Sequence, residues 1–144
     1  MLKKLILICL VSITLAGLAN ISINPEKMQF VDEHGRLRVF HGINAVYKLP
    51  PYMPSDGKFD STTTLDDNDF QLLQKWGMNF IRLGVLWEAV EPVKGQYNVT
   101  YLDEVVKMVR VGAKYGIYFL IDAHQDLGLR KYCGEGFPAY VGDS

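Results

Sequence analysis

The sequence has little excess of either charge, and it lacks the spacings that mark a metal or phosphate site. Fifteen basic and 16 acidic residues are interspersed, for a formal net charge of −1, so nothing favours nucleic acid as a partner. No set of His, Cys, Asp or Glu has metal-ligand spacing, and no glycine-rich phosphate loop occurs. We therefore predict no metal and no cofactor. What is present is 49% apolar residues in 144, enough for the core of one globular domain.

The amino terminus has the pattern of a secretory signal peptide. Lys3 and Lys4 precede an apolar run from Leu5 to Leu15, and small residues follow up to Ala19. The run falls short of the ~20 apolar residues that span a bilayer, which disfavours an uncleaved membrane anchor. We predict a signal peptide over residues 1–19, cleaved near Ala19, and a secreted mature chain over residues 20–144.

Cysteine is scarce, with Cys9 inside the predicted signal peptide and Cys133 near the end of the chain. Once the signal peptide is removed, one cysteine remains and cannot close an internal disulfide. Cys133 is then either a free thiol or the partner of a cysteine outside this sequence. Asn98 opens an N-glycosylation sequon with Thr100, usable only in a eukaryotic host.

Hydrophobic patterning predicts strands that alternate with helices. A hairpin is expected over 28–31 and 36–40, followed by strand residues up to 44 and a long proline-containing loop over 47–64. Thr64 is expected to cap a helix that ends at Gly77. A strand over 79–83, a helix over 101–114 and a continuous apolar strand over 117–121 complete the pattern.

The order strand, helix, strand, helix, strand predicts an α/β fold with parallel strands. A doubly wound nucleotide-binding fold would need a glycine-rich turn after its first strand, where this sequence has Ala45 to Lys48. A (β/α)₈ TIM barrel fits better, because polar residues such as Arg82 and His124 stand at strand ends, where barrel active sites are built. Since a barrel needs eight strands, we expect the amino-terminal part of one, about three βα units.

Four motifs carry a resemblance to a known family: FHGINAVYKLPPY, WGMNFIRLGVLWEAVEPVKGQYNVTYLDEV, GIYFLIDAHQD and KYCGEGFP. Together they resemble glycoside hydrolase family 5, and most of all its endoglycoceramidases, which cleave between the oligosaccharide and the ceramide of glycosphingolipids. The resemblance covers nearly all of residues 20–144. It implies a retaining hydrolase with a glycosphingolipid substrate and contact with a membrane surface through that lipid.

The resemblance also implies where the chemistry lies. Retaining hydrolysis uses two carboxyl groups about 5–5.5 Å apart. In the family these are glutamates at the ends of the fourth and seventh strands, which would lie beyond Ser144, so no residue of this chain is predicted to be catalytic. Glu88 and Glu91 are two nearby carboxylates, but they are interpreted as structural residues of a turn fixed by Pro92.

The resemblance assigns other roles to residues that are present. His124 and Asp126 resemble the substrate-binding pair of the family, and an imidazole beside a carboxylate suits sugar hydroxyls. Lys48, on the first loop, is placed where similar enzymes contact the glycan. Arg82 resembles the arginine that keeps the nucleophile ionised by lowering its pKa, and it is expected to lack its partner here.

Two further expectations concern the rest of the chain. Trp76 and Trp87 are predicted to belong to the core. An isolated three-stranded piece leaves an open edge along 117–121, so we expect the 144-residue chain to be poorly soluble and to hydrolyse nothing. The alternatives left open are another family 5 glycosidase, acting on a β-glucan, glucosylceramide or steryl glucoside, and a non-catalytic carbohydrate-binding remnant.

Overall fold

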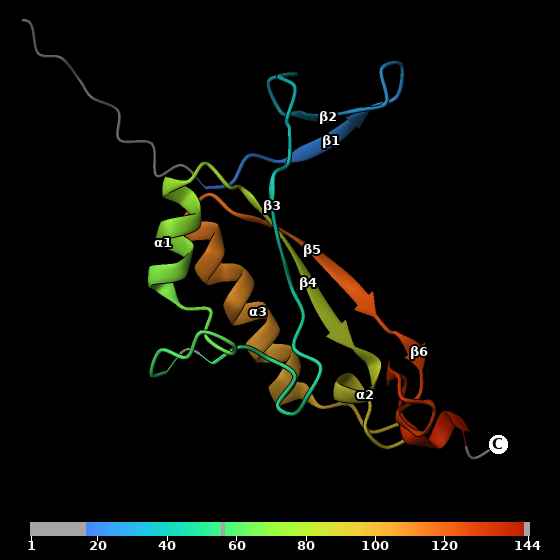
Figure 1. Ribbon diagram of the computed structural model, residues 1–144. Coiled ribbons are helices and arrows are strands. Elements are labelled where there is room, and N and C mark those ends of the chain that lie inside the picture. Colours follow the sequence, from blue (N-terminus) through green and yellow to red (C-terminus); the bar gives the residue numbers. More distant parts are fainter. Residues whose placement is uncertain (1–16, 56, 143–144) are drawn as a thin grey trace, which may run out of the picture.

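The computed structural model describes residues 17–142 except residue 56. The predicted signal peptide therefore lies almost wholly outside the described residues. The elements are β1 (Ile21–Asn24), β2 (Gln29–Asp32), β3 (Gly42–Ala45), α1 (Asp67–Lys75), β4 (Phe80–Leu86), α2 (Trp87–Val90), α3 (Val99–Lys114), β5 (Tyr118–His124), β6 (Leu127–Gly128), η1 (Arg130–Tyr132), β7 (Glu135–Gly136) and η2 (Ala139–Gly142) (Figure 1).

The central sheet is parallel and has the order β3-β4-β5. Its two longer helices, α1 and α3, lie on the same side of the sheet (Figure 1). One-sided coverage is the arrangement of a barrel wall, whose other face turns inward, whereas a doubly wound sheet carries helices on both faces. The predicted alternation of strands and helices, and the choice of a partial barrel, are confirmed.

The core lies between the sheet and these helices. Ile81 and Leu83 of β4 are fully buried and pack with Phe70 of α1 and Val105 of α3. Burying each of these side chains contributes roughly 1.5–3 kcal/mol. The close approach of α3 depends on Gly112, where an added Cβ would lie 2.5 Å from the ring of Phe119.

The opposite face of the sheet carries polar side chains. Successive residues of a strand point to opposite faces, so Arg82 points away from the helices that cover its neighbours Ile81 and Leu83. The register pairs Arg82 with Leu120 and Leu86 with His124. Arg82, Asp122 and His124 therefore share the face that the helices leave uncovered.

The amino-terminal hairpin differs from the prediction. Gln29–Asp32 pairs with Ile21–Asn24 as an antiparallel ribbon, and the predicted pairing across the turn at Gly35 is reduced to a single bridge, Val31 with Leu37. The carboxylate of Asp32 accepts the turn's own N–H groups, which closes a tight turn without extending the ladder. The short segment Ile21–Asn24 gave too few alternating residues to be predicted as a strand.

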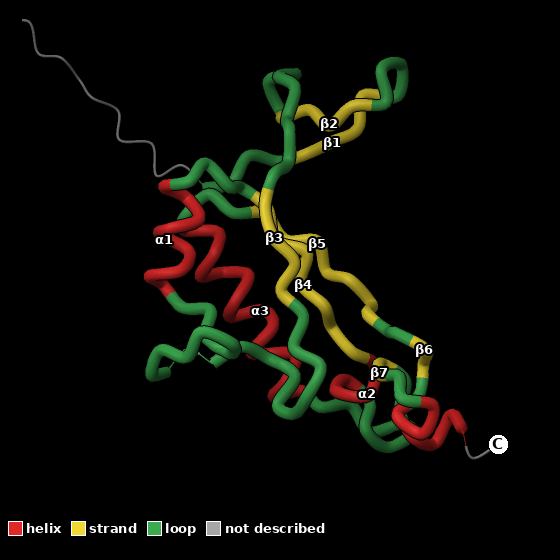
Figure 2. Tube along the Cα trace, viewed as in Figure 1, coloured by secondary structure: helices red, strands yellow, loops and turns green. Residues whose placement is uncertain are grey.

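The start of α1 and the exposure of Trp76 also differ from the prediction. The cap of α1 is Asp66, which forms a reciprocal capping box with Asp69, and Thr64 stands two residues outside it. Trp76 follows the last turn of α1 and is 63% exposed, so its prediction as a core residue was wrong. The segment between β3 and α1 is loop, as predicted (Figure 2). Among the described residues, every helix is too short or too polar to cross a membrane.

Candidate functional site

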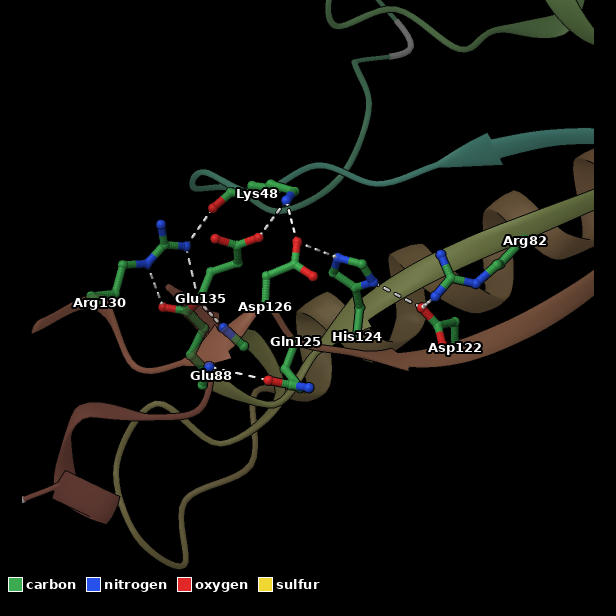
Figure 3. Close-up of polar contacts among 11 residues, drawn as sticks. Lys48, Arg82, Glu88, Asp122, His124, Gln125, Asp126, Arg130 and Glu135 are labelled. Carbon is green, nitrogen blue, oxygen red and sulfur yellow. Dashed lines mark hydrogen bonds and ion pairs between the residues drawn. The ribbon is translucent and has the colours of Figure 1, made fainter. Parts of the chain in front are cut away.

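A first charged cluster lies on the strands themselves. Arg82 Nη2 is 2.5 Å from Asp122 Oδ2, and the same oxygen lies 2.9 Å from His124 Nδ1 (Figure 3). The three side chains meet because β4 and β5 are in register and the residues share one face. The nucleophile glutamate expected as the partner of Arg82 is not part of this chain, and the carboxylate that pairs with Arg82 here is Asp122, whose role the sequence left open. We call Arg82, Asp122 and His124 the strand cluster.

The strand cluster fixes what His124 can offer a ligand. The carboxylate of Asp122 can only accept, so Nδ1 must carry the proton in their hydrogen bond. In the neutral ring this leaves Nε2 as an acceptor. Nε2 is buried, makes no hydrogen bond with the described residues, and lies 3.6 Å from Asp126 Oδ2. A hydroxyl group placed beside Nε2 would satisfy it.

A second charged cluster lies beyond the central strands, on two loop residues and on Glu135 of the short strand β7. Lys48 Nζ is 2.5 Å from both Asp126 Oδ2 and Glu135 Oε1 (Figure 3). Asp126 and Glu135 exchange backbone hydrogen bonds of 3.0 and 2.8 Å, which holds both carboxylates toward the ammonium. We call Lys48, Asp126 and Glu135 the loop cluster. The sequence predicted Lys48 and Asp126 as site residues, but not Glu135.

Charge pairing stabilises the ionised forms within the loop cluster. The hydrogen bond from the Lys48 ammonium is the main cause that holds the pKa of Asp126 below its ordinary value. The hydrogen bond to Asp126, followed by that to Glu135, raises the pKa of Lys48. Two carboxylates and one ammonium leave a net negative charge, so the loop cluster has spare acceptors for hydroxyl groups.

The ligand atoms of His124, Asp126 and Glu135 lie within 4.8 Å of one another, a grouping that could hold a metal ion. However, the Lys48 ammonium is 2.5 Å from both carboxylates. It already supplies the positive charge that a metal would bring. The arrangement therefore suits hydrogen bonding to a polyol better than metal coordination.

Glu88 and Glu91 bind groups of their own chain. Arg130 binds both oxygens of Glu88, at 3.0 and 2.8 Å, and the N–H of Gly136 donates to Glu88 at 2.9 Å. Glu91 accepts from the indole of Trp87 and from the N–H of Gly95, both at 2.7 Å. These contacts support the structural role predicted for both glutamates.

Aromatic side chains gather beside the loop cluster. Trp87 is 42% exposed, so its prediction as a core residue was wrong. Its ring lies edge-on to Phe137 at 5.8 Å and to Tyr140 at 6.2 Å between centroids.

Two other residues singled out in the sequence lie outside both clusters. The thiol of Cys133 is free and exposed, and the side chain of Asn98 caps α3 by accepting from Tyr101 N–H.

Comparison with known protein families agrees with the partial-barrel geometry. The model of the cellulase family, glycosyl hydrolase family 5, matches residues 49–142. The chain belongs to glycosyl hydrolase family 5. Both charged clusters, with the exception of Lys48, lie inside the matched segment.

Several curated proteins are similar over most of this chain. An endoglycoceramidase from Cyanea nozakii is 47% identical over 121 residues, covering 84% of this chain and 24% of its own length. One from Hydra vulgaris is 43% identical, covering 84% and 23%. A glucosylceramidase from Aspergillus fumigatus is 35% identical over 130 residues, covering 78% and 17%. The chain thus spans about a quarter or less of the length of these relatives.

Solved structures of family 5 support the partial-barrel architecture. An endogalactoceramidase superposes with a TM-score of 0.67 at 24% identity, over 86% of this chain and 30% of its own. The lactosyl-enzyme intermediate of endo-glycoceramidase II from Rhodococcus sp. superposes with a TM-score of 0.61 at 29% identity, over 76% and 26%. The three parallel strands correspond to part of a family 5 TIM barrel.

Proposed function

We propose that this chain is part of a secreted retaining endoglycosidase that hydrolyses the bond between the oligosaccharide and the ceramide of glycosphingolipids. The observation that carries this is the pair of charged clusters at the carboxyl ends of parallel strands, where barrel enzymes bind substrate. The 47% identity to an endoglycoceramidase supports the choice of substrate class. A related solved structure is described as a complex with ganglioside GM3.

The chemistry is divided between this chain and the rest of the barrel. The acid/base and nucleophile glutamates of a retaining mechanism are proposed to lie beyond Ser144. Arg82 is proposed to support the nucleophile. Since a guanidinium has five N–H donors, it can bind Asp122 and still face a second carboxylate, whose pKa its charge would lower.

The sugar is proposed to bind at the loop cluster and His124. Asp126 can accept two hydroxyl hydrogens through its two oxygens, and Lys48 can donate to a hydroxyl or ring oxygen. His124 Nε2 completes the set as an acceptor. Charge-assisted hydrogen bonds of this kind are stronger than neutral ones, so these three residues would contribute much of the affinity for the sugar.

The lipid part of the substrate is proposed to bring the protein to a membrane surface. Leu49, on the loop after β3, and Leu127, on β6, are 70% and 76% exposed. Apolar side chains around a polar site suit a substrate whose head is a glycan and whose tail stays in a bilayer. The signal peptide proposed for residues 1–19 would place the enzyme outside the cell. Sequencing the amino terminus of the secreted protein tests this, with Asn20 expected first.

Product analysis tests the reaction. The full-length protein is incubated with ganglioside GM3, with glucosylceramide and with a steryl glucoside. Release of the intact trisaccharide and ceramide from GM3 is the expected result. Release of glucose from glucosylceramide alone would assign the chain to the glucosylceramidase branch, which the 35% identity to the Aspergillus enzyme supports. Binding of GM3 without hydrolysis would indicate a carbohydrate-binding remnant.

A further inference from the structure

Three segments of the chain meet at the carboxylate of Glu88, whose side chain is 11% exposed. Both oxygens bind Arg130, which follows β5, and Oε1 also accepts from the N–H of Gly136. Tyr52 O–H, on the loop after β3, donates to Oε2 at 3.3 Å. A carboxylate has about four acceptor sites, and these donors fill them. Glu88 is therefore a fixed junction rather than a ligand for substrate.

Arg130 connects this junction to the backbone of the loop cluster. While Nε and Nη2 bind Glu88, Nη2 also donates to the main-chain oxygen of Lys48, and the guanidinium lies over the ring of Tyr52, 5.9 Å from its centroid. A planar guanidinium can make these contacts together, whereas the single ammonium of a lysine cannot. The segment that carries Lys48 is thereby attached to the segment after β5.

Glu88 also fixes the other side of the loop cluster. Gly136, which donates to Glu88, directly follows Glu135. At Gly136 φ is +113°, and an added Cβ would lie 2.5 Å from the main-chain oxygen of His124. This position can therefore hold only glycine, because β7 lies in close contact with the end of β5. The Glu88 carboxylate thus holds the residue next to Glu135 while Arg130 holds Lys48.

We propose that Glu88 and Arg130 are positioning residues that hold Lys48 against Asp126 and Glu135 before the substrate binds, so that the sugar meets a preformed site. This inference rests on the proposed function for its ligand, a glycan. Neither side chain needs to touch the sugar. Preorganisation lowers the ordering cost of binding, so its loss should raise KM and leave kcat largely unchanged.

A double-mutant cycle in the full-length protein tests the coupling. Arg130→Met should raise KM for GM3 about tenfold with kcat within roughly twofold, and Arg130→Lys should fall between Arg130→Met and wild type. In a Lys48→Met background the same Arg130→Met change should cost less than about twofold, because residues that act through one another are not additive. Arg110→Met, on the exposed side of α3, is the matched control and should change neither constant.

Additive effects of Arg130→Met and Lys48→Met would overturn the inference, and so would a fall in kcat at constant KM.

A second readout is independent of turnover. Reductive methylation followed by mass spectrometry measures the reactivity of each lysine, with Lys107 on α3 as internal reference. Arg130→Met should speed methylation of Lys48 several-fold relative to Lys107, because weaker pairing with the carboxylates leaves more of the Lys48 amine neutral. Equal methylation rates of Lys48 in Arg130→Met and in wild type would overturn the inference. This test holds even if wild type proved inactive on GM3, because inactivity would by itself reject only the proposed function.

Discussion

The two charged clusters at the carboxyl edge of the sheet have different supports. The strand cluster stands on β4 and β5, whose register places Arg82 and Asp122 on one face. The loop cluster joins Lys48 and Asp126, which are 78 residues apart, and depends on segments outside regular strands. The strand cluster is fixed by the central sheet, whereas the loop cluster is fixed by backbone hydrogen bonds between Asp126 and Glu135 and by the side-chain contact of both with Lys48.

The two clusters also differ in how far their side chains are exposed to solvent. In the strand cluster the side chains of Arg82 and Asp122 are 36% and 21% exposed. In the loop cluster those of Lys48 and Asp126 are 47% and 54% exposed. Lys48 and Asp126 are more exposed, so they can more readily exchange their mutual contact for a contact with a ligand. Arg82 and Asp122 are more enclosed, so they are better placed to stabilise the strand ends. Substitution of Asp126 should therefore affect mainly activity, and substitution of Asp122 mainly stability.

The largest effect is expected for Asp126→Asn. The amide keeps the shape but loses the charge that pairs with Lys48 and accepts hydroxyl groups. Since hydrogen bonds to charged groups are the strong ones, kcat/KM for GM3 should fall roughly 30- to 100-fold. Unfolding by urea should be nearly unchanged. Asp103→Asn on the exposed side of α3 is the control, and equal kinetics of both variants would contradict the assignment.

Next in size is Asp122→Asn in the strand cluster. Asp122 is the shared partner of Arg82 and His124. Removing its charge leaves a partly enclosed guanidinium without its carboxylate, so the free energy of unfolding should fall by about 1–2 kcal/mol. Urea denaturation followed by fluorescence measures the loss. An unchanged denaturation midpoint would mean that the cluster is not a structural support.

A smaller effect is expected in the pH dependence of stability. Burial raises the pKa of Glu88, but hydrogen bonds from Arg130 and Gly136 outweigh it and bring the pKa below its ordinary value of 4.5. A carboxyl with a depressed pKa in the folded state stabilises the fold above the unfolded pKa and loses this contribution as pH falls through the folded pKa. Wild type should therefore exceed Glu88→Gln in stability by a constant amount at neutral pH.

That margin should shrink below about pH 4.5, as the carboxyl is protonated in both states. Urea midpoints between pH 7 and pH 3 provide the comparison. Glu104→Gln, in an exposed i,i+3 pair with Lys107, should track wild type throughout. A margin that stays constant down to pH 3 would show that Glu88 is not held ionised by its partners.

The smallest effect concerns the aromatic support of the loops. Phe137→Leu removes the edge-to-face contact with Trp87 and keeps most of the apolar volume. Aromatic pairs of this kind contribute about 0.5–1.5 kcal/mol beyond area burial. We expect a loss of stability of that size, with kcat/KM nearly unchanged. A kinetic defect as large as that of Asp126→Asn would instead place Phe137 in contact with substrate.

The sequence sufficed to predict the partial barrel and to place Arg82 and His124 at strand ends. Polar residues at the end of an apolar run indicate a strand end, and parallel strands bring those ends to one edge. The partner of Arg82 was nevertheless missed, because the predicted strand stopped at Ile121 and the observed one continues to His124. Once β5 includes Asp122, the register alone pairs the two residues.

The loop cluster was only partly predictable. Lys48 and Asp126 came from a resemblance between motifs, and no local pattern marked Glu135, Arg130 or Glu88 as their partners. Such contacts depend on how loops far apart in sequence fold back, which periodicity does not report. The two glycines around Glu135 were the available signal, because they indicate a tight approach of backbone that can aim a side chain.

The central claim is that the loop cluster binds a sugar, and titration calorimetry with the GM3 oligosaccharide tests it most directly. The full-length wild type should bind the oligosaccharide, and Lys48→Met should bind it roughly tenfold or more weakly. The control Lys107→Met should bind like wild type. Equal affinity of Lys48→Met and wild type would contradict the account, because it would show that the sugar does not contact this edge of the sheet.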